Sequence, residues 1–140
     1  MNRISRILVT GLLSWLVPFL VSIPLYPQGQ PVLDLQLTKS ILIVVGGLVG
    51  AWLALWYLKG VKAGFTREGA VLGTAWFALN CGLDILVLVG PLKRIYLATW
   101  AGQIGVRYLL LPIMTTAMGA AADIRAKPWE ILSGSSPTPL

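Results

Sequence analysis

A carboxylate stands inside a stretch of sequence that is otherwise long and apolar enough to cross a bilayer. The stretch reads EGAVLGTAWFALNCGLDILVLVGP from Glu68 to Pro91, and the carboxylate is Asp84. A span needs about 20 predominantly apolar residues, and an unmatched charge within one costs about 3 kcal/mol. We therefore expect Asp84 to face a partner inside the protein.

The predicted partner is Arg107, the other ionisable residue well inside an apolar segment. Asn80 precedes Asp84 by four positions, and Gln103 precedes Arg107 by four, so a helix places each pair on one face. A turn of a few residues joins the two segments, which predicts antiparallel neighbours. Because helical side chains lean toward the helix N-terminus, the arginine reaches the depth of the acid. The predicted intramembrane polar cluster is Asn80, Asp84, Gln103 and Arg107.

Two interpretations of this cluster remain open. It is either a structural clasp that fixes the register of two helices, or a waypoint for protons or ions on a transport path. If the charges pair, Asp84→Asn and Arg107→Gln made singly should each destabilise the protein more than the double change does, because each leaves an orphaned charge.

Other chemistry is excluded or unsupported. With Cys81 as the single cysteine and no histidine, one chain has no intrachain disulfide and none of the usual zinc or imidazole-ligated haem sites. Nothing resembles a nucleophile with its base, or a glycine-rich phosphate loop. We therefore predict no catalytic residue, no metal site, no cofactor and no enzymatic activity. Trp15, Trp76 and Trp100 are interpreted as packing residues.

The composition places the chain in lipid. Of its 140 residues 56% are hydrophobic and 11% are charged, which is not a soluble composition. The net charge of +6 comes from residues that mostly flank apolar segments, as membrane anchors do, so we expect the bilayer and not nucleic acid as a partner.

The elements that position the cluster are four transmembrane helices in an all-α bundle with up-down order. A signal peptide is the alternative for the first span, but no small-x-small cleavage site follows it. Thr38 and Thr66 are the predicted helix caps of the second and third spans. The predicted domain covers residues 1–132, with a disordered tail at 133–140 and spans at about 7–26, 40–58, 69–90 and 96–122.

Two pairs of glycines four residues apart predict close helix packing, because small residues let helix backbones approach. They are Gly46 with Gly50 in the second span and Gly69 with Gly73 in the third. Such pairs recur by chance in glycine-rich apolar segments, so they do not establish a homodimer.

The distribution of positive charge predicts that both termini face the cytoplasm. The side of the membrane opposite the termini carries the smaller set of basic residues, Lys39, Lys93 and Arg94. The predicted location is an inner or plasma membrane, or another energy-transducing membrane. The larger set of basic residues lies on the same side of the membrane as the termini, and its members are Arg3, Arg6, Lys59, Lys62, Arg67, Arg125 and Lys127.

Two motifs resemble those of a group of small four-span prokaryotic integral membrane proteins of uncharacterised function. They are E-G-x-x-x-G-x-x-W-x-x-x-N-x-x-x-D from Glu68 to Asp84 and I-G-x-R-Y-L-x-x-P from Ile104 to Pro112. The resemblance covers mainly the second half of the chain. It implies a four-helix membrane fold and supplies no activity.

Two functions from different classes are compatible with these features. The first is a non-catalytic accessory or scaffold subunit that packs in a homo-oligomer or with other membrane subunits, since four spans in 140 residues leave no room for a soluble catalytic domain. The alternative is a small oligomeric ion or solute channel or transporter that uses the Asp84 and Arg107 cluster as its polar path.

Overall fold

A computed structural model describes residues 2–89 and 96–132, apart from the side chains of Gln28, Gln103 and residues 127–132. In this part of the chain every regular element is helical and no β-strand occurs. The elements are α1 (Arg3–Leu25), η1 (Pro27–Gly29), α2 (Leu35–Leu58), α3 (Phe65–Asp84), η2 (Ile85–Val89), α4 (Leu97–Gln103), η3 (Gly105–Leu109) and α5 (Leu110–Leu132).

Four helical stretches among the described residues are long and apolar enough to cross a membrane, which confirms the predicted all-α fold with four candidate spans. The third consists of α3 and the π-helical turn η2, and the fourth of η3 with most of α5. The predicted turn around Lys93 and the predicted tail at 133–140 lie outside the described residues. The stretches are Arg3–Leu25, Leu35–Leu58, Phe65–Val89 and Gly105–Ala126.

The second long helix begins before the predicted position because of a carboxylate. Asp34 directly precedes α2 and accepts hydrogen bonds from the backbone N–H groups of Gln36 at 2.9 Å and Leu37 at 3.2 Å. Such a cap satisfies N–H groups that have no partner within the helix. The prediction that Thr38 is the cap was therefore wrong, and Thr38 is a buried residue of the first turn.

The third helix also begins earlier than predicted. Gly64 precedes α3 with a φ of 69°, a left-handed conformation that glycine adopts without steric cost. Thr66 was predicted to be the cap but lies inside the helix. Its backbone N–H donates a hydrogen bond to the carboxylate of Asp123 in α5.

The last apolar segment is interrupted where the sequence predicts one helix over residues 96–122. The interruption is η3, a 3-10 turn over Gly105–Leu109 that separates α4 from α5. Gly105 weakens an α-helix, and Pro112 supplies no N–H for the carbonyl group of Tyr108 four residues before it. The segment consequently tightens into the 3-10 turn ahead of the proline.

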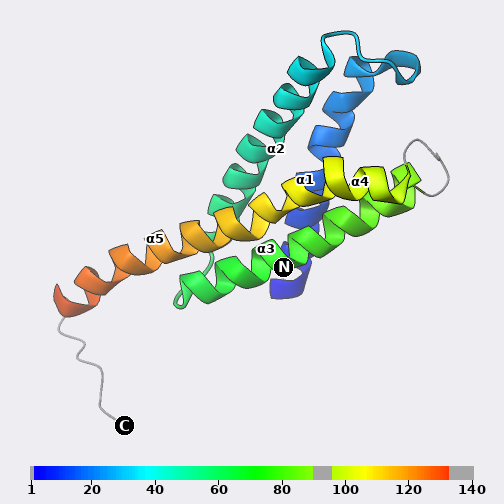
Figure 1. Cartoon of the computed structure of the whole chain (residues 1–140). Coiled ribbons are helices and arrows are strands. Elements are labelled where there is room, and N and C mark those ends of the chain that lie inside the picture. The colour runs from blue at the N-terminus through cyan, green and yellow to red at the C-terminus, as the bar shows by residue number, and fades with distance from the viewer. Residues whose placement is uncertain (1, 90–95, 133–140) are drawn as a thin grey trace.

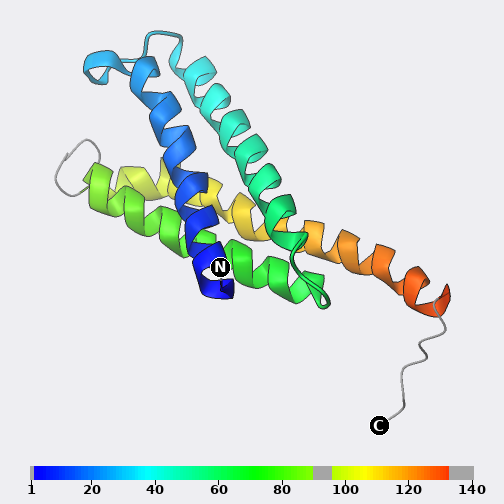
Figure 2. The same cartoon turned by 180° about the vertical axis from the view of Figure 1, so that it is seen from behind.

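Figures 1 and 2 show two pairs of long helices that cross one another. In the first pair α1 and α2 are antiparallel, because Arg6 near the start of α1 bonds Tyr57 near the end of α2. In the second pair α3 and α5 lie side by side and share the most extensive contact of any two described elements. α1 crosses α3 and joins the two pairs.

Glycines allow the close approach of α3 and α5. A Cβ atom on Gly69 would overlap the backbone carbonyl of Thr115, and one on Gly73 would overlap the Thr115 hydroxyl and the backbone of Pro112. Gly119 in α5 meets the backbone at the start of α3 in the same way. These contacts run in opposite directions along the two helices, so α3 and α5 are antiparallel.

The glycines predicted to pack in α2 make looser contacts. A Cβ atom on Gly50 would lie 3.2 Å from the terminal methyl group of Met114, and one on Gly46 would lie 3.8 Å from the ring of Pro18. The neighbouring Gly47 has no atom within 4 Å of such a position. The closest helix approach through glycine in the described chain is therefore between α3 and α5.

The apolar core lies where α1, α2 and the middle of α3 meet. Trp76 and Leu72 of α3 are completely buried there. Large side chains on the outer surfaces of α1, α2 and α5 remain exposed, as lipid-facing residues do. The buried members of the core are Ile7, Leu53, Ala54, Tyr57, Leu58, Leu72 and Trp76.

Candidate functional site

Asp84 is the last residue of α3 and is buried, with 4% of its surface exposed. It shares one face of the helix with Trp76 and Asn80, because the three residues follow at intervals of four. Both of these residues are buried as well, at 0% and 1% exposure. One face of α3 therefore carries a row of polar atoms into the interior.

Three uncharged donors hold the carboxylate of Asp84. The indole N–H of Trp15 in α1 donates to Oδ1 at 2.6 Å. The indole N–H of Trp100 in α4 donates to Oδ2 at 3.1 Å, and the phenol of Tyr108 in η3 donates to the same oxygen at 2.8 Å. One acid thus ties the end of α3 to three other segments, and hydrogen bonds to a charged acceptor are stronger than neutral ones.

The predicted ion pair between Asp84 and Arg107 is absent from the structure. Arg107 is exposed, and it forms no ion pair with Asp84; an ion pair among the described side chains joins Arg3 to Glu68. The cause is the 3-10 turn η3, which advances by about three residues per turn instead of 3.6. This change of helical phase presents Tyr108 to the acid in place of Arg107.

Asn80 belongs to a row of hydrogen bonds between α1 and α3, and does not contact a guanidinium group. Its amide nitrogen donates to the Ser14 hydroxyl at 3.1 Å and to the carbonyl of Trp76 at 2.8 Å. The indole of Trp76 donates to the Thr10 hydroxyl at 3.1 Å. Each hydroxyl donates in turn to a carbonyl of its own helix at 2.7 Å. The side chain of Gln103 lies outside the described residues.

The buried polar side chains of the described residues all have hydrogen-bond partners. Sequence reasoning missed the donors Trp15, Trp100 and Tyr108, and assigned the two tryptophans to packing alone. The available signal was chemical: an indole N–H that is buried needs an acceptor, and Asp84 is the strongest acceptor in the apolar segments.

A second polar group joins α1, α2 and α3 at the opposite end of α3. Arg3 contacts both carboxylate oxygens of Glu68, at 2.9 Å and 3.1 Å. The phenol of Tyr57 donates to Glu68 at 2.8 Å. The Arg3 side chain is 55% exposed, so solvent screens this ion pair and weakens its contribution to stability.

Arg6 closes the end of α2. Its Nη2 donates to the carbonyl of Tyr57 at 2.8 Å and to that of Trp56 at 3.4 Å. The guanidinium carbon of Arg6 also lies 5.0 Å from the centre of the Tyr57 ring and 5.3 Å from the centre of the Trp56 ring. A cation at a helix C-terminus is favourable because the unpaired carbonyl groups there carry partial negative charge.

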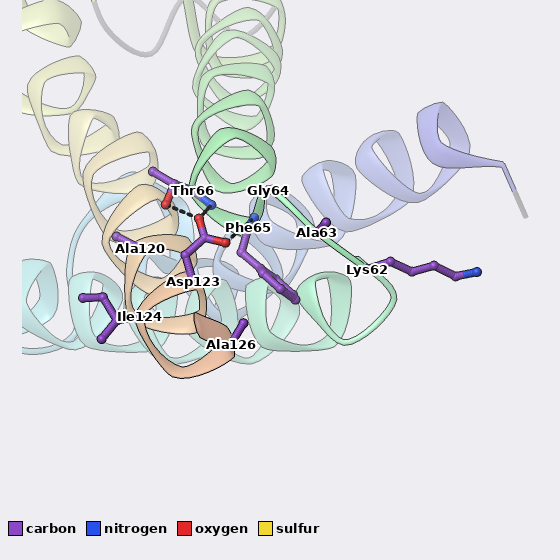
Figure 3. Close-up of a pocket in the computed structure, with 9 residues that line it drawn as sticks. All are labelled: Lys62, Ala63, Gly64, Phe65, Thr66, Ala120, Asp123, Ile124 and Ala126. Atoms are coloured by element: carbon purple, nitrogen blue, oxygen red, sulfur yellow. Dashed lines mark hydrogen bonds between the residues drawn. The ribbon is translucent and has the colours of Figure 1, made fainter. Parts of the chain in front are cut away.

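Asp123 of α5 caps α3 from a distance of more than fifty residues in the chain. Its carboxylate accepts hydrogen bonds from the N–H groups of Phe65 at 3.0 Å and Thr66 at 2.8 Å, and from the Thr66 hydroxyl at 2.5 Å. Figure 3 shows these bonds beside a cavity of about 350 Å³, with Lys62 extending away from the acid. The cap adds a polar link to the glycine contacts between α3 and α5.

The side chains of these groups form hydrogen bonds between helices. Within the described residues no group of three or more histidine, cysteine or acidic side chains is placed to bind a metal ion. Cys81 is a free, partly buried thiol. The Asp84 group and the Glu68 group lie sixteen residues apart on α3, which is about 24 Å at 1.5 Å per residue. The two groups form hydrogen bonds from opposite ends of α3 to other elements.

Comparisons with known proteins add no relative to this picture. A scan against protein-family models, a search of curated proteins and a search of solved structures each find no match to the chain. The resemblance to small four-span prokaryotic membrane proteins stays a prediction.

Proposed function

We propose that the chain is a small multi-pass membrane protein that serves as a non-catalytic accessory or scaffold subunit, in a homo-oligomer or a larger membrane complex. The proposal is supported by four apolar helices of spanning length, and by buried polar side chains that all have hydrogen-bond partners within the described part of the chain. What such a protein offers to its surroundings is its apolar outer surface, which lipid or other subunits can cover.

The observation that carries the proposal is the occupancy of Asp84. Both of its oxygens accept hydrogen bonds, from three side chains on three different segments. The two cavities described here are lined by residues near Lys62, close to the start of α3 and not its Asp84 end. A carboxylate engaged in this way acts as a structural clasp, the first of the two interpretations of the cluster.

The competing proposal is a small oligomeric channel or transporter, and one observation favours it. Asp84 is an acid buried within a candidate span without a cationic partner among the described residues, and acids in spans commonly mark transport paths. On this proposal its three donors would release the acid during each transport cycle.

Extraction and reconstitution of the full-length protein distinguish the two proposals. We expect protein purified in mild detergent to have the mass of an oligomer, or to retain other membrane polypeptides in fixed ratio. We expect its liposomes to pass protons and monovalent cations no faster than empty liposomes do. Mass by light scattering and dye-reported flux measure these outcomes.

The control for the flux measurement is an acid outside the cluster. Flux above background that Asp84→Asn abolishes and Asp34→Asn preserves would establish the transport proposal. A monomer that retains no partner and carries no flux would contradict the subunit proposal.

We also propose that both termini face the cytoplasm. The support is the excess of basic residues near the starts of α1 and α3, as the positive-inside rule requires. In a Cys81→Ala background, Ala63→Cys should react with a membrane-impermeant maleimide in inside-out vesicles, and Gln30→Cys in right-side-out vesicles. Both native side chains are exposed. The reverse pattern would invert the orientation.

A further inference from the structure

One end of the molecule carries more positive charge than its acids neutralise. Of the two acidic residues with described side chains there, Glu68 bonds Arg3 and Tyr57, and Asp123 bonds the first turn of α3. Within the described part of the chain, the basic side chains at this end are Arg3, Arg6, Lys59, Lys62, Arg67 and Arg125.

Three of these cations line one cavity of about 320 Å³ between α1, the end of α2 and the link to α3. They are Arg3, Arg6 and Lys62, and the carboxylate in the lining is Glu68, which leaves an excess of two positive charges. A cavity with such an excess attracts anions, and the arginine fork suits the oxygens of a phosphate group.

The Arg6 guanidinium is already fixed in this cavity. Two backbone carbonyl groups and two aromatic rings hold it, as described above, and it packs against Gly60, where a Cβ atom would overlap it. Its carbonyl partners are neutral and accept only from Nη2, so its charge remains available to an anion. A cation held in position loses little side-chain entropy when it binds.

The cavity lies at the level expected for lipid headgroups. Three candidate spans begin or end around it, at Arg3, Leu58 and Phe65. Trp52 and Trp56 on the last turns of α2 are exposed, at 67% and 44%, as aromatic residues at a membrane interface are.

We propose that this cavity binds the phosphate headgroup of an anionic phospholipid, with Arg6 and Lys62 as the main cationic contacts and Arg3 shared with Glu68. The inference requires the bilayer placement that the proposed function assumes, but it does not require the subunit role. The acyl chains would lie along the exposed apolar surface of α2.

Binding is tested with the full-length protein in mild detergent, by native mass spectrometry and thermal shift. The probes are phosphatidylglycerol, phosphatidylcholine and glycerol phosphate. We expect saturable binding of phosphatidylglycerol with a rise in melting temperature, and at least tenfold weaker binding of the other two. Equal binding of phosphatidylcholine would overturn the proposal. Saturation by glycerol phosphate at the same concentration would show that the ligand is a soluble phosphate.

Variants of matched charge locate the site. Lys62→Gln should weaken phosphatidylglycerol binding about fivefold, since each basic residue near an anionic lipid contributes a factor of this size. Lys62→Arg should restore it. Lys59→Gln removes the same charge outside the cavity lining and should change binding less than twofold. Equal losses of phosphatidylglycerol binding from Lys59→Gln and Lys62→Gln would show that the lipid binds by general electrostatic attraction to the surface. This result would refute a specific site in the cavity.

Arg6→Gln should weaken binding at least as much as Lys62→Gln, but it also removes the contacts that close α2. The Lys62 variants decide the question because Lys62 lies exposed in a link and has no hydrogen bond among the described residues. A partner subunit is absent from these measurements, so lipid binding can succeed or fail independently of the subunit proposal.

Discussion

Asp84→Asn is expected to lower the free energy of unfolding by about 2–4 kcal/mol. The amide replaces one acceptor oxygen with a donor, so at least one of the facing N–H or O–H groups loses its partner inside the protein. The remaining hydrogen bonds lose the contribution of the charge, and an unsatisfied buried donor costs about 1–3 kcal/mol. Thermal or denaturant unfolding in detergent, followed by tryptophan fluorescence, measures the loss.

Arg107→Gln is the matched control for this prediction. Because Arg107 is exposed and does not pair with Asp84, its replacement should cost less than about 0.5 kcal/mol. The double variant should then be the sum of the two single changes. If Arg107→Gln were strongly destabilising and the double variant regained stability, the two charges would pair after all.

Gly73→Ala is expected to lower the free energy of unfolding by about 2 kcal/mol. The new methyl group would overlap the Thr115 hydroxyl and the backbone of Pro112, and backbone atoms of a packed helix cannot move aside singly. Overpacking of this kind costs about 1–3 kcal/mol. Alanine is the better helix former by about 1 kcal/mol, which offsets only part of the cost. The same unfolding measurement applies.

Gly82→Ala provides the control on the same helix. Gly82 is exposed, and no atom lies within 4 Å of the position that its Cβ would occupy. This change should be neutral or stabilising by up to about 1 kcal/mol. Equal destabilisation by Gly73→Ala and Gly82→Ala would contradict the close contact between α3 and α5.

The helical architecture was predictable because it depends on properties that are additive along the chain. Length and hydropathy indicated four apolar segments, and four long apolar helices are present among the described residues. The starts of α2 and α3 were placed too late because the groups that cap them were overlooked. Asp34 is adjacent to its helix and was visible in the sequence, whereas Asp123 is brought to α3 only by the fold.

The choice between Arg107 and Tyr108 as a partner of Asp84 could not be predicted, for a related reason. The need for a partner followed from the cost of an acid in lipid, and α1 and η3 meet that need. The identity of the partner depended on the helical phase after Gly105, and a single tightened turn exchanges Arg107 for Tyr108. The helical phase is the direction in which each side chain points around the helix axis, and every local irregularity changes it. It therefore cannot be predicted beyond a glycine and a proline.

The order of the donors along the chain has a consequence for biosynthesis. Trp15 precedes Asp84, whereas Trp100 and Tyr108 follow it. A nascent chain that has emerged only as far as the third helix therefore contains one of the three donors, Trp15. Synthesis of the last segment supplies the remaining two donors, so all three hydrogen bonds to Asp84 can form only after translation has passed residue 108.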